Sequence, residues 1–156
     1  MSPSQRASTL RESPCWHLVV RVGDADSFTP ATARRDQVLT LLLDGSTIPQ
    51  HALGGRVTHN VWSSIDERRL VAPPIAIDLL RLASAVYAAD ARVVRRSAYD
   101  GWTREFVLHV PVTQPALWEG AVEPLLDLLG FLTGDHWQLH FRPLMLASGS
   151  TATGRP

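Results

Sequence analysis

The stretch FLTGDHWQLHFRP, residues 131–143, contains the sharpest change of secondary structure in this sequence. It begins with the end of an apolar helix, and Gly134 follows as a left-handed helix cap. Apolar and polar residues then alternate, so that Trp137, Leu139 and Phe141 share one face. The stretch therefore predicts a helix that ends at Gly134 and a final strand whose apolar face packs on the core.

Upstream of this stretch the sequence alternates between strand and helix periods. Strands are predicted at CWHLVVRV (15–22), QVLTLLLDG (37–45) and TREFVLHVPV (103–112). Helices are predicted at IAIDLLRLASAVYAADARV (75–93), which begins after two prolines, and from Pro115 to Gly134, where Pro124 would kink or split the helix. Residues 46–74 show weak alternation and a possible helical turn at SSIDERR (63–69), so their structure stays open.

The helix at 75–93 carries a single polar stripe at three- and four-residue spacing. The stripe consists of Asp78, Arg81, Ser84, Ala88 and Arg92. The other positions are Leu, Ile, Val, Tyr and many alanines. This pattern predicts a helix that is buried around most of its circumference and lies close against a sheet.

The order of these elements predicts an α+β fold. We expect a mainly antiparallel sheet of about four strands with two main helices on one face, and a ferredoxin-like topology is one arrangement that fits. Residues 15–143 are expected to form a single domain. Residues 1–14 and 144–156 are rich in Ser, Thr, Pro and Gly, and we expect them to form a disordered N-terminal tail and a flexible C-terminal tail.

Composition argues against several classes of function. The fifteen basic residues are all arginine and balance fifteen acidic residues, so no lysine chemistry is available and a general nucleic-acid surface is not expected. The single cysteine, Cys15, excludes an internal disulfide and a thiolate zinc cluster. The sequence contains no signal-peptide pattern and no apolar run that could span a membrane, so we expect a cytoplasmic protein without a membrane partner.

Three histidines fall on the strand faces that point away from the core. If their strands are neighbours, His17, His109 and His140 could meet and bind a metal. The alternative is that they are ordinary polar residues on an open sheet face. No acidic residue lies beside them in sequence to orient the imidazoles, and we therefore predict no metal site.

Three other segments have a structural explanation that outweighs a catalytic one. LLLDGST (41–47) ends a strand with an Asp-Gly turn, and Ser46 and Thr47 lack a recognisable base. GDADS (23–27) lacks the glycine and distal glutamate of a calcium loop and is expected to be a solvated turn. Cys15 stands at the start of a strand beside a tryptophan, where a core position is expected.

Two charged surfaces are candidate binding sites. Glu119, Glu123 and Asp127 recur every four residues, and they form either a solvated face or a docking surface for an arginine-bearing partner. RVVRRSAYDGWTR (92–104) combines arginines with aromatic residues, which suits phosphate contact and base stacking. The nucleic-acid candidates are Arg92, Arg95, Arg96, Trp102 and Arg104. Arginines at the end of a helix also complement its dipole, which is sufficient as a structural explanation.

Three segments together resemble one protein family. They are DLLRLASAVYAADARVVRR (78–96), DGWTREFVLHVPV (100–112) with Trp118 shortly after, and FLTGDHWQLHFRP (131–143). Their order and spacing are similar to the N-terminal region of QueC-like, 7-cyano-7-deazaguanine-synthase-like proteins of Qat-type anti-phage defence systems. The resemblance implies that this region precedes a PP-loop ATPase domain, for which ATP and zinc are the implied cofactors.

The PP-loop signature of that family is Ser-Gly-Gly-x-Asp-Ser, and SGSTAT (148–153) stands at the corresponding place. Ser148 and Gly149 fit the signature, whereas Ser150, Ala152 and Thr153 depart from it. We therefore assign no catalytic, cofactor-binding or metal-binding residue and do not expect this chain alone to be an enzyme.

The expected function is that of a non-catalytic N-terminal module. It would position a protein partner from the same operon or a PP-loop ATPase domain. Two alternatives stay open: half of a split ATP-dependent deazaguanine (preQ0-type) synthase, and a nucleic-acid-binding domain.

Overall fold

The computed structural model describes residues 14–23, 25–31, 33–34, 37–43, 54–57 and 60–145. The strands are β1 (Cys15–Val22), β2 (Val38–Leu43), β3 (Gly54–Arg56), β4 (Glu105–Val112) and β5 (His136–Pro143). The helices are α1 (Val61–Glu67), α2 (Pro74–Arg92), α3 (Pro115–Glu119) and α4 (Val122–Thr133), with a short 3-10 helix, η2, at Arg95–Ser97. The predicted turn at Asp44–Gly45 and the segment SGSTAT lie outside the described residues.

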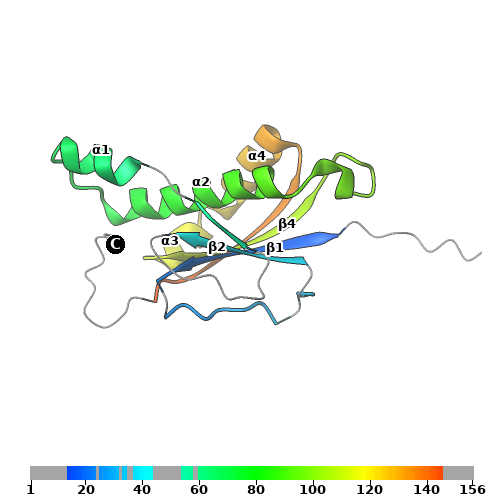
Figure 1. The fold of residues 1–156 in the computed structure, drawn as a ribbon, viewed down its shortest axis with the longest axis horizontal. Coiled ribbons are helices and arrows are strands. Elements are labelled where there is room, and N and C mark those ends of the chain that lie inside the picture. Colours follow the sequence, from blue (N-terminus) through cyan, green and yellow to red (C-terminus); the bar gives the residue numbers. More distant parts are fainter. Residues whose placement is uncertain are drawn as a thin grey trace, which may run out of the picture.

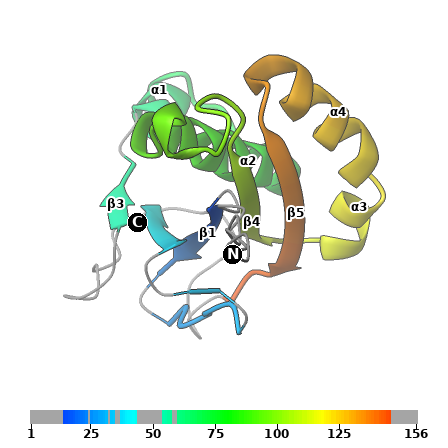
Figure 2. The same ribbon diagram turned by 90° about the vertical axis from the view of Figure 1, so that its right-hand side faces the viewer.

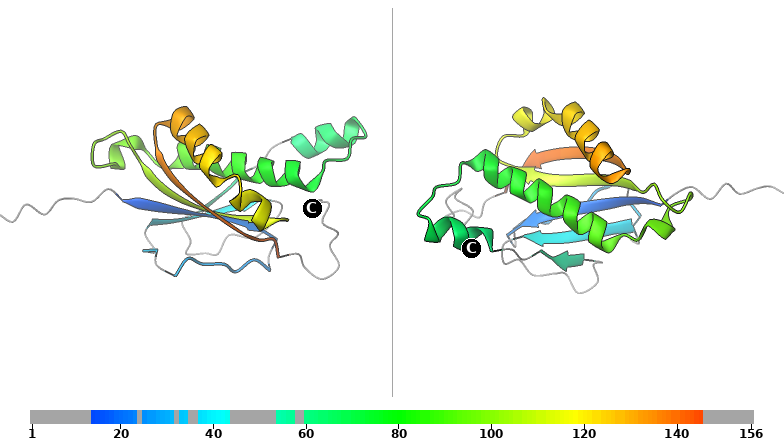
Figure 3. Two further views of the ribbon diagram at one scale, coloured as in Figure 1. Left: turned by 180° about the vertical axis from the view of Figure 1, so that it is seen from behind. Right: turned by 90° about the horizontal axis from the view of Figure 1, so that it is seen from above.

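The five strands form one sheet in which every pair is parallel. The strand order is β3-β2-β1-β4-β5, and β4 pairs with β5 from Glu105–His136 to Val112–Pro143. Figure 3 shows this order from above. The prediction of an α+β fold with a mainly antiparallel sheet is therefore wrong, and so is a ferredoxin-like topology. The chain has an α/β fold.

Long connections explain why neighbouring strands are parallel. Residues 23–37 link β1 to β2, and α1 with α2 link β3 to β4. A segment of that length can return the chain to the end of the sheet where it started, whereas a tight hairpin cannot. The run Leu41, Leu42 and Leu43 is buried at every position, which is typical of a parallel strand covered on both faces. This run of three leucines can be seen in the sequence, where it indicates a parallel strand.

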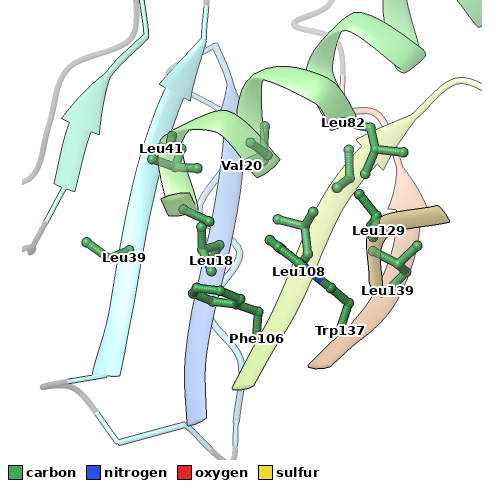
Figure 4. Packing of buried hydrophobic residues seen from close by; sticks show 14 of the residues in the cluster. Leu18, Val20, Leu39, Leu41, Leu82, Phe106, Leu108, Leu129, Trp137 and Leu139 are labelled. Carbon is green, nitrogen blue, oxygen red and sulfur yellow. The ribbon is translucent and has the colours of Figure 1, made fainter. Parts of the chain in front are cut away.

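The helices cover one face of the sheet, as Figures 1 and 2 show. Helix α2 crosses β2, β1 and β4, while α3 and α4 pack against β5. The core between them joins Leu18 of β1, Leu108 of β4 and Leu82 of α2 (Figure 4). Trp137 and Leu139 belong to this core, which confirms the inward face predicted for the last strand. Among the described residues, no helix is both long and apolar enough to span a membrane.

The polar stripe of α2 is buried except for Arg92, and an apolar part of the helix is exposed. Asp78 accepts hydrogen bonds from the backbone N–H of Thr113 at 2.9 Å and from its hydroxyl at 2.7 Å, and pairs with Arg81 at 2.8 Å. Leu79 and Tyr87 are exposed instead. The prediction that the helix is buried around most of its circumference is wrong, because only one side of α2 is buried. The buried side includes Asp78, whose partner Thr113 directly follows β4.

The second predicted helix is divided at Gly120 and Ala121 rather than at Pro124. Pro124 lies in the first turn of α4, where the N–H group that proline lacks has no intrahelical partner in any case. Gly134 has φ 69° at the end of α4, and this confirms the predicted left-handed cap.

Candidate functional site

Three histidines lie side by side on the sheet face opposite α2 and α4. His17 comes from β1, His109 from β4 and His140 from β5, and the parallel register pairs His109 directly with His140. The ring centroids of His17 and His109 are 5.6 Å apart, and those of His109 and His140 are 5.2 Å apart. Parallel pairing therefore gathers the three imidazoles that the sequence placed on one face.

The rings of His17 and His109 meet edge to edge. Their planes differ by 12°, and Nδ1 of His17 lies 3.3 Å from Nε2 of His109. This N–N distance is shorter than the centroid distance by about twice the radius of an imidazole ring, so the two nitrogens face each other directly. One ring must donate its N–H to the other. The two side chains thus form a hydrogen-bonded pair rather than a face-to-face stack.

A pocket of about 410 Å³ opens over these rings and is named here the imidazole pocket. Its lining on the sheet is His17, Val107, His109, Gln138, His140 and Arg142. Phe28, Pro30 and Ala31 line it from the connection between β1 and β2, which runs beneath the sheet in Figure 1. The ring of Phe28 lies 5.3 Å from that of His109. The pocket is therefore built from segments far apart in the sequence.

The turn after β1 holds this connection against the sheet. Arg142 donates to Asp26 at 2.5 Å and to the carbonyl of Val20 at 2.6 Å, and its guanidinium lies 4.7 Å from the centroid of the Phe28 ring. Asp26 also accepts the backbone N–H of Phe28 at 3.2 Å. Asp26 is buried, so the described part of GDADS anchors the pocket and is not merely a solvated turn.

Burial, and after it the positive charges of His140, His17 and Arg142, lower the pKa of His109 to about 4. Burial and then His140 also lower the pKa of His17. Both rings are therefore neutral at pH 7. Within the described part of the chain, no group of three His, Cys, Asp or Glu side chains is arranged to hold a metal.

Cys15 is not an activated nucleophile. Its side chain is partly buried at the start of β1, and burial followed by the negative charge of Glu105 raises the pKa of the thiol. A thiol with a raised pKa has less of the reactive thiolate at neutral pH.

The basic segment 92–104 contributes mainly to the structure. Arg104 is 2% exposed and donates to Asp135 at 2.6 Å and to Asp90 at 2.7 Å. Arg95 donates to Asp135 at 3.1 Å, and its guanidinium lies 4.8 Å from the centroid of the Trp102 ring. These two arginines already hold carboxylates, so they are poorly placed to receive phosphates.

The remaining nucleic-acid candidates are more exposed. Arg92 donates to the carbonyl of Gly54 at 3.3 Å, and its guanidinium occupies the space that a Cβ on Gly55 would need. Arg96 and Trp102 are exposed. The five candidates therefore do not form one continuous exposed basic surface.

Glu119, Glu123 and Asp127 are all exposed on α3 and α4. Beside them on α4 lie three exposed apolar side chains: Leu128 is 50% exposed, Phe131 88% and Leu132 65%. We call these six residues the α4 surface. At about 100° per residue along α4, Glu123 and Asp127 fall on one half of the exposed arc and the three apolar residues on the other. The surface thus has an acidic half and an apolar half.

No family model, curated protein or solved structure matches this chain.

Sequence reasoning missed the apolar half of the α4 surface and most of the imidazole pocket. The spacing of Leu128, Phe131 and Leu132 shows that they share one side of the helix, but not that this side is exposed. The contact between Asp26 and Arg142 spans 116 residues, and no local pattern reveals it.

Proposed function

We propose that this chain is a non-catalytic module that docks a protein partner through the α4 surface. The supporting observation is the exposure of Phe131, Leu132 and Leu128 on a helix whose opposite side is packed in the core. Adjacent exposed apolar side chains with a charged rim are typical of protein-binding surfaces.

The acidic half of the surface selects the kind of partner. Glu119, Glu123 and Asp127 complement a partner that presents arginine or lysine around an apolar centre. The resemblance to QueC-like defence proteins makes a PP-loop ATPase domain the partner we propose. Any ATP or zinc would then belong to that domain, and we assign no cofactor to this chain. The proposed setting is antiviral defence in the cytoplasm.

The two alternatives are weaker or depend on the same surface. A split deazaguanine synthase would join its halves through the α4 surface, and it differs only in that the complex would turn over ATP. Nucleic-acid binding through segment 92–104 is disfavoured because Arg104 is buried and Arg95 is paired with Asp135.

The proposal predicts that one exposed aromatic residue dominates binding. A PP-loop ATPase domain of the QueC-like type, produced as a separate chain, is titrated calorimetrically with this protein. Phe131→Ser should raise Kd at least tenfold, because apolar and aromatic anchors carry most interface energy. Tyr87→Ser is the matched control, since Tyr87 is 70% exposed on α2, and it should leave Kd unchanged. Equal effects of the two variants would refute the assignment.

A further inference from the structure

The geometry points to the imidazole pocket as a binding site for a small organic anion. When the anion binds, the pair of His17 and His109 takes up one proton. This site is separate from the α4 surface and does not depend on the proposed docking function. Its lining combines an apolar wall with hydrogen-bonding groups, which is the usual make-up of a small-molecule site.

The lining favours an anion because the described residues that form it include no carboxylate. Its polar groups are the three imidazoles, the Gln138 amide and the Arg142 guanidinium. The apolar groups Phe28, Pro30 and Val107 complete the walls. A ligand with a ring and a carboxylate would satisfy both parts, whereas a bare inorganic ion would leave the apolar wall without a contact.

The charges around His109 explain why its imidazole resists protonation. His17 and Arg21 come from β1, His140 and Arg142 from β5, and Glu105 lies at the start of β4 itself. Asp26, from the connection after β1, already pairs with Arg142. No negative charge is therefore left close to His109 among the described residues, and a bound anion would supply one.

The hydrogen bond between His17 and His109 explains how the pair can accept the proton. In the neutral pair, one nitrogen donates and the other accepts, which leaves one outward nitrogen with a proton and one without. Adding a proton gives both outward nitrogens an N–H group. The protonated pair thus offers an anion an additional donor as well as a positive charge.

The test uses benzoate, with benzamide as its neutral analogue, in calorimetric titrations of the whole chain between about pH 5.5 and 7.5. Benzoate is expected to bind more tightly as the pH falls, by up to about tenfold per unit, because one proton is taken up. Buffers with different heats of ionisation should report uptake of about one proton. Benzamide should bind at least tenfold more weakly.

Three variants separate the pocket from the rest of the sheet face. His109→Gln should remove the pH dependence of benzoate binding. His140→Gln should weaken binding several-fold, and since His140 is exposed, this variant does not threaten folding. His136→Gln is the matched control, because His136 is exposed on the same strand and face but does not line the pocket.

Three results would overturn the inference. The first is no binding of benzoate up to about 10 mM, where weak affinities are still measurable. The second is binding that does not change with pH or with His140→Gln. The third is tight binding of Zn²⁺ that is lost in His109→Gln while benzoate has no effect, which would identify a metal site instead.

Discussion

At the scale of single residues, Asp135 connects the ends of three elements. It accepts the backbone N–H of Arg104 at 3.0 Å and Nη2 of Arg104 at 2.6 Å, and it pairs with Arg95 at 3.1 Å. Arg104 in turn donates to the carbonyl of Val93 at 2.6 Å, just after α2. The Gly-Asp pair of FLTGDHWQLHFRP therefore has a structural role, which is to join the start of β5 to the start of β4 and the end of α2.

Replacing this carboxylate should destabilise the fold strongly. Asp135→Asn leaves the buried guanidinium of Arg104 with only the exposed carboxylate of Asp90 as its charged partner. Breaking a buried ion pair in this way costs about 3–5 kcal/mol of unfolding free energy. Denaturation with urea measures the change, and Asp127→Asn on the exposed side of α4 should stay within about 0.5 kcal/mol of the wild type. Similar losses in both variants would contradict this role of Asp135.

His109 should make stability fall in mild acid. Its pKa is about 4 in the folded protein and about 6.5 when unfolded, so between these values the unfolded chain binds more protons. Stability therefore decreases as the pH drops below 6.5, by up to about 3 kcal/mol near pH 4.

The comparison with His109→Gln isolates this contribution, because glutamine does not titrate. The free energy of unfolding of the wild type minus that of the variant should decrease as the pH falls from 7 to 4. A difference that stays constant, or one that grows toward acid, would show that His109 is not held neutral by the fold. His136→Gln serves again as the control on the same sheet face.

At the scale of elements, the glycines at the ends of α3 and α4 differ in backbone conformation. Gly134 closes α4 with φ 69°, whereas Gly120 closes α3 with φ −66°. A Cβ on Gly134 would meet no atom closer than 3.7 Å, so the left-handed backbone alone resists a side chain there. Gly134→Ala should cost about 1 kcal/mol, and Gly120→Ala should be neutral or slightly stabilising. Thermal denaturation of both variants tests this, and equal shifts in Tm would count against it.

Local sequence patterns predicted most helices and strands, because caps, prolines and alternation mark where these elements begin, run and end. The cap at Gly134, the prolines at the start of α2 and the alternation in β4 and β5 each depend on a few neighbouring residues. The strand directions were predicted wrongly as mainly antiparallel, since they depend on how far each connection travels across the sheet. The buried run of β2 was the one local sign of parallel pairing.

Each of the two candidate sites could likewise be predicted only in part from the sequence. The acidic residues of the α4 surface could be found from their four-residue spacing. The imidazole pocket could not be completed, because Phe28 and Arg142 reach His109 only through the strand order β1-β4-β5 and the connection beneath the sheet. Sequence alternation placed the histidines on one face but did not show that their strands are neighbours.

At the scale of the whole molecule, the sheet separates two kinds of surface. The helices lie on one face, and α4 presents an acidic and apolar exterior beside β5. The other face carries the imidazole pocket, which is lined by the sheet and by the connection between β1 and β2. This connection runs beneath the sheet in Figure 1. A partner docked on α4 would leave that pocket accessible, so binding of a protein and of a small anion should be independent to first order.

The most direct test of the docking proposal is an NMR footprint of the ¹⁵N-labelled chain with a PP-loop ATPase domain of the QueC-like type, the proposed partner. We predict that the amide signals that shift or broaden come from residues 117–132, with Asp127, Leu128 and Phe131 among the strongest. Signals of His17 and His109 should stay in place. A footprint centred on the histidine face or on residues 92–104, or no footprint at all, would contradict docking through the α4 surface.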